Sequence, residues 1–421
     1  MTKTMQKSAY DVCVVGLGYI GLPTALVLSS EGLKVHGVDI NPETVTKLMS
    51  GELTISEPGL QDLLTTGLDT KRFTATMEAV HARNFIISVP TPLTADKHAD
   101  LSFVYDAAQS LIPVLAGSDL IVIESTCPPG TTNQVAKLVA EQRPDLTLSP
   151  GQSNSLYVAY CPERVIPGST LKELRSNSRV IGGINEESSL RAQALYETFC
   201  DGELVITEAT TAELTKLAEN SFRDTNIAFA NELSDVSHEL GIDVWEVIRL
   251  ANRHPRVQIL NPGPGVGGHC IAVDPWFIHE AAPEQSRIIK ASRELNDARP
   301  KNLVQQIIAE LSSNKEVSIC ALGLSFKANV DDLRGSPAVA VVKALAQSLP
   351  MATIDAIEPF IDELPNNLGL PTNVELVPIP DDLNEYDVIV VLTDHDQFRV
   401  LNAPSSIGTR VFDTRGLWKS Q

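Results

Sequence analysis

Short apolar runs that alternate with helix-length segments constrain the fold of this chain more than any other feature. The runs are rich in Val, Ile and Leu, and segments such as residues 22–31 and 132–141 separate them. This alternation predicts a parallel sheet covered by helices on both faces. The strands predicted in the first half of the chain are residues 12–15, 35–39, 85–89, 120–124, 157–160, 180–184 and 204–206.

A second and smaller set of apolar runs lies toward the carboxyl end. Ser336 followed by Pro337 is typical of a helix start, because serine caps free N–H groups and proline suits the first helical position. These patterns predict a second Rossmann-like domain. Its predicted strands are residues 317–323, 353–357, 388–392 and 411–413.

One long helix is predicted between the two patterns, from Thr210 to Gly241. Apolar residues recur there at spacings of three and four, which favours an amphipathic helix, and Thr210 with Glu213 forms the T-x-x-E pattern of a capping box. The predicted fold class is α/β, with two Rossmann-like doubly wound parallel-sheet domains joined by a central helical dimerisation region. The domains are expected at residues 1–207, 208–305 and 306–421.

Composition argues against several functional classes. The net charge of −20 disfavours binding to nucleic acid or to a membrane surface, because both need a basic patch. No apolar run reaches the roughly 18 residues of a membrane span. Six cysteines without C-x-x-C spacing predict neither a zinc site nor a disulfide framework, and they fit a reducing cytoplasm. We expect no bound metal.

A candidate cofactor site follows the first predicted strand. The turn GLGYIG opens the next helix, and although G-x-G-x-x-G also occurs in turns that bind nothing, strand, turn and helix here stand in the required order. Its glycines allow a tight turn, the approach of a pyrophosphate and close helix packing. Asp39 ends the second strand, where a carboxylate accepts ribose hydroxyls and repels a 2′-phosphate, so NAD is favoured over NADP. The turn residues expected at the cofactor are Gly16, Gly18, Tyr19, Ile20 and Gly21.

Two other strand ends are expected beside the nicotinamide. Pro90 and Thr91 follow one predicted strand, and Thr126 follows the next. Ligands of open α/β sheets lie at the carboxyl ends of the strands. These residues are therefore candidate cofactor contacts, with ordinary turn chemistry as the alternative.

The segment GPGVGGHCIAVDP, residues 263–275, is the most informative for chemistry. Its glycines let the backbone bend round a ligand, and residues 271–279 are predicted to be a helix. Cys270 would then lie at a helix N-terminus, which favours the nucleophilic thiolate, although a cysteine is more often a small core residue. His269 is expected to contact the substrate, or to support a residue that does, rather than to pair with Cys270, because adjacent helical residues do not share a face.

Lys216 and Asn220 lie four residues apart on the predicted long helix and therefore share one face. Together they would make two donors for a developing oxyanion. The alternative is a lysine that extends to solvent beside a polar surface residue.

Seven segments together resemble the UDP-glucose/UDP-mannuronate dehydrogenase family over nearly the whole chain. They are GLGYIGLPTA, VPTP, ESTCPPGTT, CPERVIPG, ELTKLAENSFRDTNIAFANE, GPGVGGHCIAVDPWF and GLSFKANVDDLRGSPA. GPGVGGHCIAVDPWF and TDHDQF are most similar to the bacterial members that oxidise UDP-N-acetyl-D-mannosamine for surface polysaccharide. The resemblance implies that a C6 alcohol is oxidised twice with two NAD, through a thiohemiacetal and a thioester on Cys270.

The resemblance also implies roles for other residues. Lys216 and Asn220 match an oxyanion-stabilising and water-orienting pair, Asp274 and Thr126 belong to a network that holds the base water, and Glu163 assists thioester hydrolysis. A homodimer is implied, with Arg256, or alternatively Arg253, reaching the partner's substrate. Lys327 and Arg334 match a segment near the cofactor and diphosphate. The substrate-binding residues implied are Glu163, Arg164, Lys216, Asn220, Arg256, Gly263, Gly265, Gly267, Gly268, His269, Lys327 and Arg399.

The substrate is not settled by these motifs. Glucose-specific members commonly carry a lysine where this chain has Val273, which favours UDP-N-acetylhexosamines, with UDP-N-acetyl-D-mannosamine first and the N-acetylglucosamine and N-acetylgalactosamine epimers open. Two other classes also fit part of the pattern: a two-electron hydroxy-acid dehydrogenase, which needs no Cys270, and a regulatory NAD-binding protein without turnover. The yield of NADH per sugar separates all three.

Overall fold

The computed structural model describes residues 9–166, 168–311, 316–406 and 408–419. The chain forms two compact units: Trp276–Ala282 joins the residues up to Ala218 in the first, and the remainder forms the second. The boundary falls within two helices, α8 (Ala209–Leu240) and α10 (Asp274–Ala281). The expected division into three domains remains a prediction.

The first unit is built on an eight-stranded sheet in the order β3-β2-β1-β4-β5-β6-β7-β8. Its first six positions have the order of a dinucleotide-binding sheet, with a topological switch between β1 and β4. All neighbours pair in parallel except β6 and β7, which are antiparallel, so the predicted parallel sheet is confirmed except at this one pair. The strands are β1 (Tyr10–Val15), β2 (Val35–Val38), β3 (Phe73–Thr76), β4 (Ala82–Ile87), β5 (Leu120–Ile123), β6 (Tyr157–Tyr160), β7 (Arg179–Gly183) and β8 (Leu204–Glu208).

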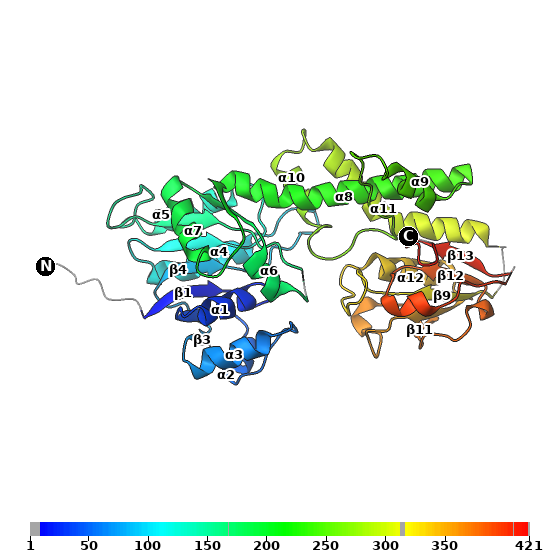
Figure 1. Ribbon diagram of the computed structural model, residues 1–421, viewed down its shortest axis with the longest axis horizontal. Coiled ribbons are helices and arrows are strands. Elements are labelled where there is room, and N and C mark those ends of the chain that lie inside the picture. The colour runs from blue at the N-terminus through cyan, green and yellow to red at the C-terminus, as the bar shows by residue number, and fades with distance from the viewer. Residues whose placement is uncertain (1–8, 167, 312–315, 407, 420–421) are drawn as a thin grey trace. The chain divides into compact units, whose positions relative to one another are not determined.

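Helices cover both faces of this sheet, as the alternating apolar runs predict. Successive residues of β1 show the division: Val12 and Val14 pack with α1 and α3, whereas Cys13 and Val15 pack with α4 and α5. A strand buried on both faces needs a continuous apolar run. The α-helices of this unit, labelled in Figure 1, are α1 (Gly21–Ser30), α2 (Pro42–Met49), α3 (Leu60–Asp69), α4 (Ser102–Leu111), α5 (Thr131–Gln142), α6 (Thr170–Ser176) and α7 (Glu186–Tyr196). A short 3-10 helix, η1 (Ile112–Val114), directly follows α4.

The second unit contains a five-stranded, fully parallel sheet in the order β11-β10-β9-β12-β13. This is again the order of a nucleotide-binding sheet, with its switch between β9 and β12. The two α/β patterns seen in the sequence are thereby confirmed. The strands are β9 (Ser318–Leu322), β10 (Thr353–Ile357), β11 (Val374–Leu376), β12 (Val388–Val391) and β13 (Arg410–Asp413).

The two faces of the second sheet are covered differently. Residues of α11 and α12 pack on one face, whereas Leu383, Phe398 and Trp418 pack on the other. Ser336 caps α12 by accepting the N–H groups of Ala338 and Val339, as predicted. The helices of this unit, besides α8 and α10, are α9 (Val244–Ala251), α11 (Arg287–Glu310), α12 (Pro337–Ser348), η2 (Asn366–Leu368), η3 (Leu383–Glu385) and η4 (Asp396–Val400). None of the helices described is both long enough and apolar enough to cross a membrane.

The predicted capping box at the start of the long helix was wrong. Helix α8 begins at Ala209, and Thr210 already lies within it. Glu213 is fully buried and caps a different helix: its carboxylate accepts the N–H of Gly130 at 2.5 Å and the N–H of Thr132 at 2.7 Å, at the start of α5. A tertiary partner therefore took the carboxylate that the local pattern assigned to its own helix.

Replacing Glu213 with alanine should lower the free energy of unfolding by about 2 kcal/mol, because it leaves two buried N–H groups without an acceptor. Thermal or urea unfolding of the purified chain measures the change. Glu239→Ala, at an exposed position near the other end of the same helix, is the matched control. Equal stability of the two variants would contradict the capping role.

Candidate active site

The glycine turn after β1 has the geometry that a dinucleotide needs. Gly16 has φ +94°, and a Cβ there would lie 2.2 Å from the carbonyl oxygen of Ser88. A Cβ on Gly21 would lie 1.9 Å from the carbonyl oxygen of Gly16, so α1 packs closely on the strand. At Gly18, which is exposed, a Cβ would meet nothing within 4 Å. The protein therefore leaves open the one glycine position at which a pyrophosphate approaches the backbone.

Asp39 directly follows β2 and stands beside this turn. Its Oδ2 accepts the N–H of Leu17 at 3.0 Å, and its Oδ1 accepts the N–H of Asn41 at 2.8 Å. Each carboxylate oxygen has a second acceptor site, and the residue is partly exposed. The side chain is thus held in place and still able to accept ribose hydroxyls. Tyr19, also in the turn, is 41% exposed.

The strand-end residues expected near the nicotinamide are brought together. The hydroxyl of Thr91 donates to the carbonyl oxygen of Thr126 at 2.7 Å, and the N–H of Val89 donates to Oγ of Ser125 at 2.9 Å. These bonds join the segments after β4 and β5, which are neighbouring strands. Pro90 lies exposed in the first of these segments.

Glu163 is held by a buried arginine that the sequence patterns did not single out. Its Oε2 lies 3.1 Å from Arg179 at the start of β7, and its Oε1 accepts the N–H of Arg164 at 2.6 Å. The Arg179 guanidinium also lies over the rings of Tyr196 and Phe199, at 4.9 and 5.3 Å from their centroids. A lone arginine opening an apolar strand was the available signal, because burying its charge requires such a partner.

Glu124, which directly follows β5, belongs to the same buried cluster. The pKa of its carboxyl is raised to about 7, mainly by burial and also by the nearby Glu163, whereas Arg179 and the hydroxyl of Tyr196 oppose the rise. Tyr196 donates to Oε1 of Glu124 at 2.6 Å. The cluster thus contains one carboxylate paired with arginine and one carboxyl that titrates near neutral pH.

Cys270 lies in the second unit, and of the six cysteines it is the exposed one. The predicted helix over residues 271–279 begins later, at Asp274, where the Asp-Pro pair suits a helix start. A turn precedes it, in which the carbonyl oxygen of Cys270 accepts the N–H groups of Val273 and Asp274 at 3.0 and 2.9 Å. The thiol therefore stands one turn before the helix rather than at its first residue.

Two predicted catalytic residues of the second unit are in direct contact. The amide of Asn220 donates to Oδ2 of Asp274 at 2.6 Å, and both side chains are buried. Lys216 lies one turn before Asn220 on α8 and is 8% exposed. The structure thus pairs the amide with the carboxylate at the start of the helix that follows the cysteine.

The glycine loop before Cys270 is held at both ends. Gly263 donates its N–H to Asn231 at 2.8 Å, and its carbonyl oxygen accepts from Nε of Arg299 at 3.2 Å. A Cβ on Gly267 would lie 2.6 Å from the carbonyl oxygen of Gly335, and one on Gly268 would lie 2.9 Å from the ring of Phe326. These glycines are required because the loop packs closely on the segment between β9 and α12.

A pocket in the second unit lies at the switch between β9 and β12. Pro264 and Gly265 of the glycine loop border it, as do Lys327 and Asp394. Arg415, which the sequence patterns missed, also borders it, and its guanidinium pairs with Asp394 at 2.7 Å. Lys327 and Arg415 therefore place two positive charges at this pocket, and such charges suit a diphosphate group.

Other residues that were predicted to contact the substrate or the cofactor are not among those that border this pocket. Arg399 is exposed on η4, where its Nε donates to Asp396 at 3.1 Å, and it is not among the residues that border the pocket. Arg334 is exposed and makes two hydrogen bonds to Asp332, at 2.8 and 2.7 Å. His269 and Arg256 are exposed.

The stability of the chain should depend on pH through Glu124. Below a pH of about 4.5 the carboxyl is protonated in the folded and unfolded states alike. Between there and about 7 only the unfolded state loses the proton, so the folded state becomes less stable as pH rises. Relative to Glu124→Gln, the native chain should lose roughly 2–3 kcal/mol between pH 5 and pH 8. Denaturant unfolding at both pH values tests this, Glu197→Gln controls for charge, and a constant difference would contradict it.

Three models of one protein family match the chain in order. They describe the NAD binding domain, the central domain and the UDP binding domain of the UDP-glucose/GDP-mannose dehydrogenase family, and they match residues 10–200, 210–298 and 320–420.

Individual relatives match over nearly their full length. NDP-N-acetyl-D-galactosaminuronic acid dehydrogenase of Ralstonia nicotianae is 48% identical, over 97% of this chain and 96% of that protein. UDP-N-acetyl-D-mannosamine dehydrogenase of Escherichia coli is 46% identical, over 97% and 99%. The solved UDP-D-ManNAc dehydrogenase of Pyrococcus horikoshii is 36% identical with a TM-score of 0.85, covering 98% of this chain and 96% of that one. The chain therefore belongs to the UDP-glucose/GDP-mannose dehydrogenase family.

Proposed function

We propose that this chain oxidises the C6 alcohol of a UDP-N-acetylhexosamine to the carboxylate, using two NAD for each sugar. The observation that carries the proposal is the exposed Cys270, which stands between a glycine loop and the Asn220–Asp274 pair. A two-electron dehydrogenase has no use for an exposed thiol at this position. A regulatory NAD-binding protein would need neither the thiol nor the pair.

The two oxidations at C6 use residues with separate roles: a cofactor site, a nucleophile and groups that stabilise charge. The glycine turn after β1 and Asp39 would hold NAD, which would supply the hydride acceptor for each of the two oxidations at C6. The Cys270 thiolate adds to the C6 aldehyde and forms a thiohemiacetal, whose oxidation yields a thioester. Lys216 and Asn220 stabilise the oxyanion at C6, and Asp274 holds the water that accepts the departing proton.

Hydrolysis of the thioester completes the reaction. Water adds to the C6 carbonyl, the C–S bond breaks, and the Cys270 thiolate and the uronate are released. Glu163 and Thr126 assist this step by orienting the water. Glu163 suits orientation because Arg164 and Arg179 hold its two oxygens.

UDP-N-acetyl-D-mannosamine is the substrate we propose first. Relatives named for N-acetylmannosamine and for N-acetylgalactosaminuronic acid match at nearly equal identity, so the galactosamine and glucosamine epimers are the alternatives. Val273 precedes Asp274 and offers an apolar contact where a lysine would favour an unsubstituted sugar. The six free cysteines fit a reducing compartment, and we propose the cytoplasm.

The decisive measurement is the yield of NADH at limiting sugar, with UDP-ManNAc, UDP-GlcNAc, UDP-GalNAc and UDP-glucose in turn. We expect two NADH for each UDP-ManNAc consumed, because the aldehyde and the thiohemiacetal are oxidised in succession. Cys270→Ala should yield no more than one, since it cannot form the thioester. Cys200→Ala, at a buried cysteine, is the matched control. One NADH from the unaltered chain, or two from Cys270→Ala, would contradict the mechanism.

We propose further that two copies of the chain associate through α8. Phe222, Phe229, Val236 and Leu240 recur on this helix at spacings of seven and four, and they are 68, 50, 47 and 65% exposed. An apolar stripe of this spacing is typical of helices that pack on one another. Arg256, exposed in the same unit, is the candidate to reach the partner's substrate.

Placing a charge in this stripe should separate the copies. Phe229→Glu should halve the mass measured by light scattering, because a carboxylate would be buried without a partner at the interface. Ile288→Glu changes a residue that is 73% exposed on α11 and should leave the mass unchanged. A dimer that persists in both Phe229→Glu and Phe222→Glu would rule out this surface.

A further inference from the structure

The loop that carries Lys327 is held in place by side chains rather than by secondary structure. It runs from Leu324 to Gly335, between β9 and α12, and none of its residues lies in a helix or strand. Glu358, which directly follows β10, accepts the N–H groups of Leu324 and Ser325 at 2.8 and 2.9 Å. The start of the loop is thereby fixed to the end of a neighbouring strand.

Glu358 stands where Asp39 stands in the first sheet. In both sheets the first strand is followed by a glycine whose N–H donates to the last residue of the neighbouring strand, β2 or β10. The carboxylate that follows this neighbouring strand accepts the next N–H of the turn. Asp39 is partly exposed, whereas the side chain of Glu358 is 0% exposed and also contacts His395 at 3.1 Å. Glu358 is therefore not available to a ribose, and its role is internal.

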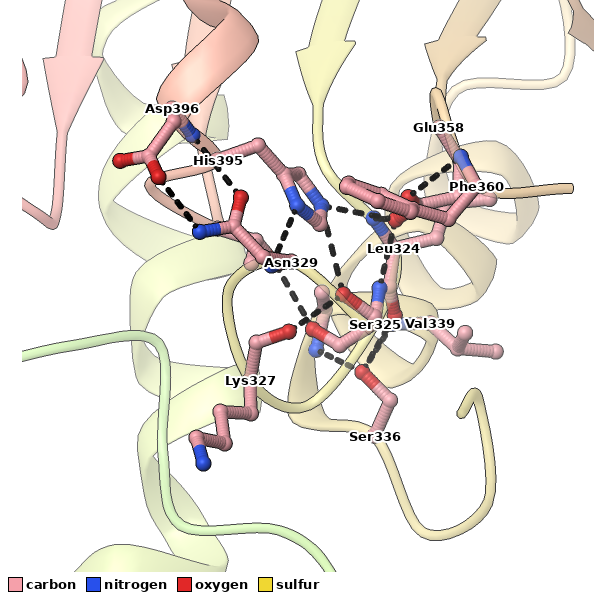
Figure 2. A network of polar contacts seen from close by, with 12 residues as sticks. Leu324, Ser325, Lys327, Asn329, Ser336, Val339, Glu358, Phe360, His395 and Asp396 are labelled. Atoms are coloured by element: carbon pink, nitrogen blue, oxygen red, sulfur yellow. Dashed lines mark hydrogen bonds and ion pairs between the residues drawn. The ribbon is translucent and has the colours of Figure 1, made fainter. Parts of the chain in front are cut away.

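His395 joins this carboxylate to the far side of the loop. Its side chain is 0% exposed, and it lies between the rings of Phe360 and Phe398, at centroid distances of 5.0 and 5.2 Å. Figure 2 shows the imidazole between Glu358 and the backbone of Asn329. The histidine thus links Glu358, which holds the start of the loop at Leu324 and Ser325, to Asn329 in the middle of the loop.

The hydrogen bonds assign the two ring nitrogens. The backbone N–H of Asn329 donates to Nδ1 at 2.9 Å, so Nδ1 carries no hydrogen. Nε2 therefore carries the hydrogen and faces Oε2 of Glu358 at 3.1 Å. Only a ring that accepts on one side and donates on the other satisfies both contacts.

Asn329 is the turning point of the loop, with φ +62°. Its side chain exchanges two hydrogen bonds with Asp396, at 2.8 and 3.0 Å. Lys327 lies two residues earlier, and its carbonyl oxygen accepts the hydroxyl of Ser325 at 2.8 Å. Lys327 and Asp394, the residue before His395, both border the pocket at the switch between β9 and β12. His395 itself does not border the pocket, but it connects the segment that carries Lys327 with the segment that carries Asp394.

We propose that His395 is a positioning residue for the diphosphate of the substrate: it contacts no ligand, but its Nδ1 holds the Asn329 turn so that Lys327 faces the phosphates. This inference rests on the proposed UDP-sugar function. It assigns a role to a buried side chain that the sequence patterns did not single out.

Two substitutions separate the two ring nitrogens. His395→Asn keeps an acceptor near the position of Nδ1 and removes the donor, whereas His395→Gln keeps a donor near the position of Nε2 and removes the acceptor. We expect His395→Gln to raise the Kd for UDP and the KM for the UDP-sugar about tenfold, the equivalent of about 1.4 kcal/mol. His395→Asn should stay within about threefold of the native values, the equivalent of about 0.6 kcal/mol. In both, kcat and the KM for NAD should change little.

Combination with Lys327→Ala tests whether the effect passes through Lys327. In Lys327→Ala, the further change His395→Gln should weaken UDP binding little, because the residue it positions is gone. His36→Gln, at a buried histidine of the first sheet, is the control for general loss of packing and should leave UDP binding unchanged.

Three outcomes would overturn the proposal: equal effects of His395→Asn and His395→Gln, a parallel loss of NAD and UDP affinity, or full additivity with Lys327→Ala. Calorimetry with UDP alone keeps this test separate from the proposed function. A native chain that releases two NADH for each sugar while His395→Gln binds UDP normally would refute only the positioning role. A native chain that binds no UDP would refute the proposed function itself.

Discussion

A glycine placed directly after the first strand of each sheet is the constraint on which both proposed nucleotide sites depend. Gly16 and Gly323 have φ values of +94° and +89°, and each donates its N–H to the last residue of the neighbouring strand at 2.8 Å. A Cβ at Gly323 would lie 2.3 Å from Thr393, much as one at Gly16 would collide with Ser88. The chain turns tightly at these points because the next strand's loop lies against it. Each turn consequently opens beside the topological switch, where a ligand reaches the backbone.

A buried polar network gives the cysteine loop a similar support. Arg293 is fully buried and pairs with Asp224, whose oxygens also accept the amide of Asn296. Asn296 in turn accepts from Asn231 at 2.9 Å, and Asn231 holds the N–H of Gly263. Such a network is costly unless every member is satisfied. This network lies between α8 and α11, and it fixes the start of the glycine loop at Gly263. Without it, the glycines of the loop could take many conformations.

Local patterns predicted much of this structure because local physics decides it. The glycine turn, Ser336 with Pro337 and the long helix all depend on residues close in sequence. The edge strand β11 was not predicted, because three residues carry little periodicity. The start of α10 was placed too early, since the turn at Cys270 also satisfies a helical spacing.

The side-chain roles that the sequence patterns missed share one cause, which is a partner far away in sequence. Arg179, Arg415 and His395 belong to no local motif. Each of them forms its main polar contact with a carboxylate at least 16 residues away. Glu213 had a plausible local role, yet its partners lie 81 and 83 residues away. As a local cap, Glu213 would have satisfied N–H groups that water can also reach. Leaving a buried N–H group without an acceptor costs more free energy of folding than losing such a surface cap. A side chain that can reach a buried partner far away in sequence therefore binds that partner rather than its local one.

The acidic composition has a structural use of the same kind. Glu57 accepts the N–H groups of Gly168 and Thr170, Glu213 caps α5, and Asp39 and Glu358 hold the two glycine turns. In each case a carboxylate neutralises backbone dipoles at the start of a loop or helix. These four carboxylates are thereby bound to backbone N–H groups, and none of the four borders the pocket at the switch between β9 and β12. Lys327 and Arg415 border that pocket, so a chain with a net charge of −20 still places cations at the proposed site of an anionic nucleotide.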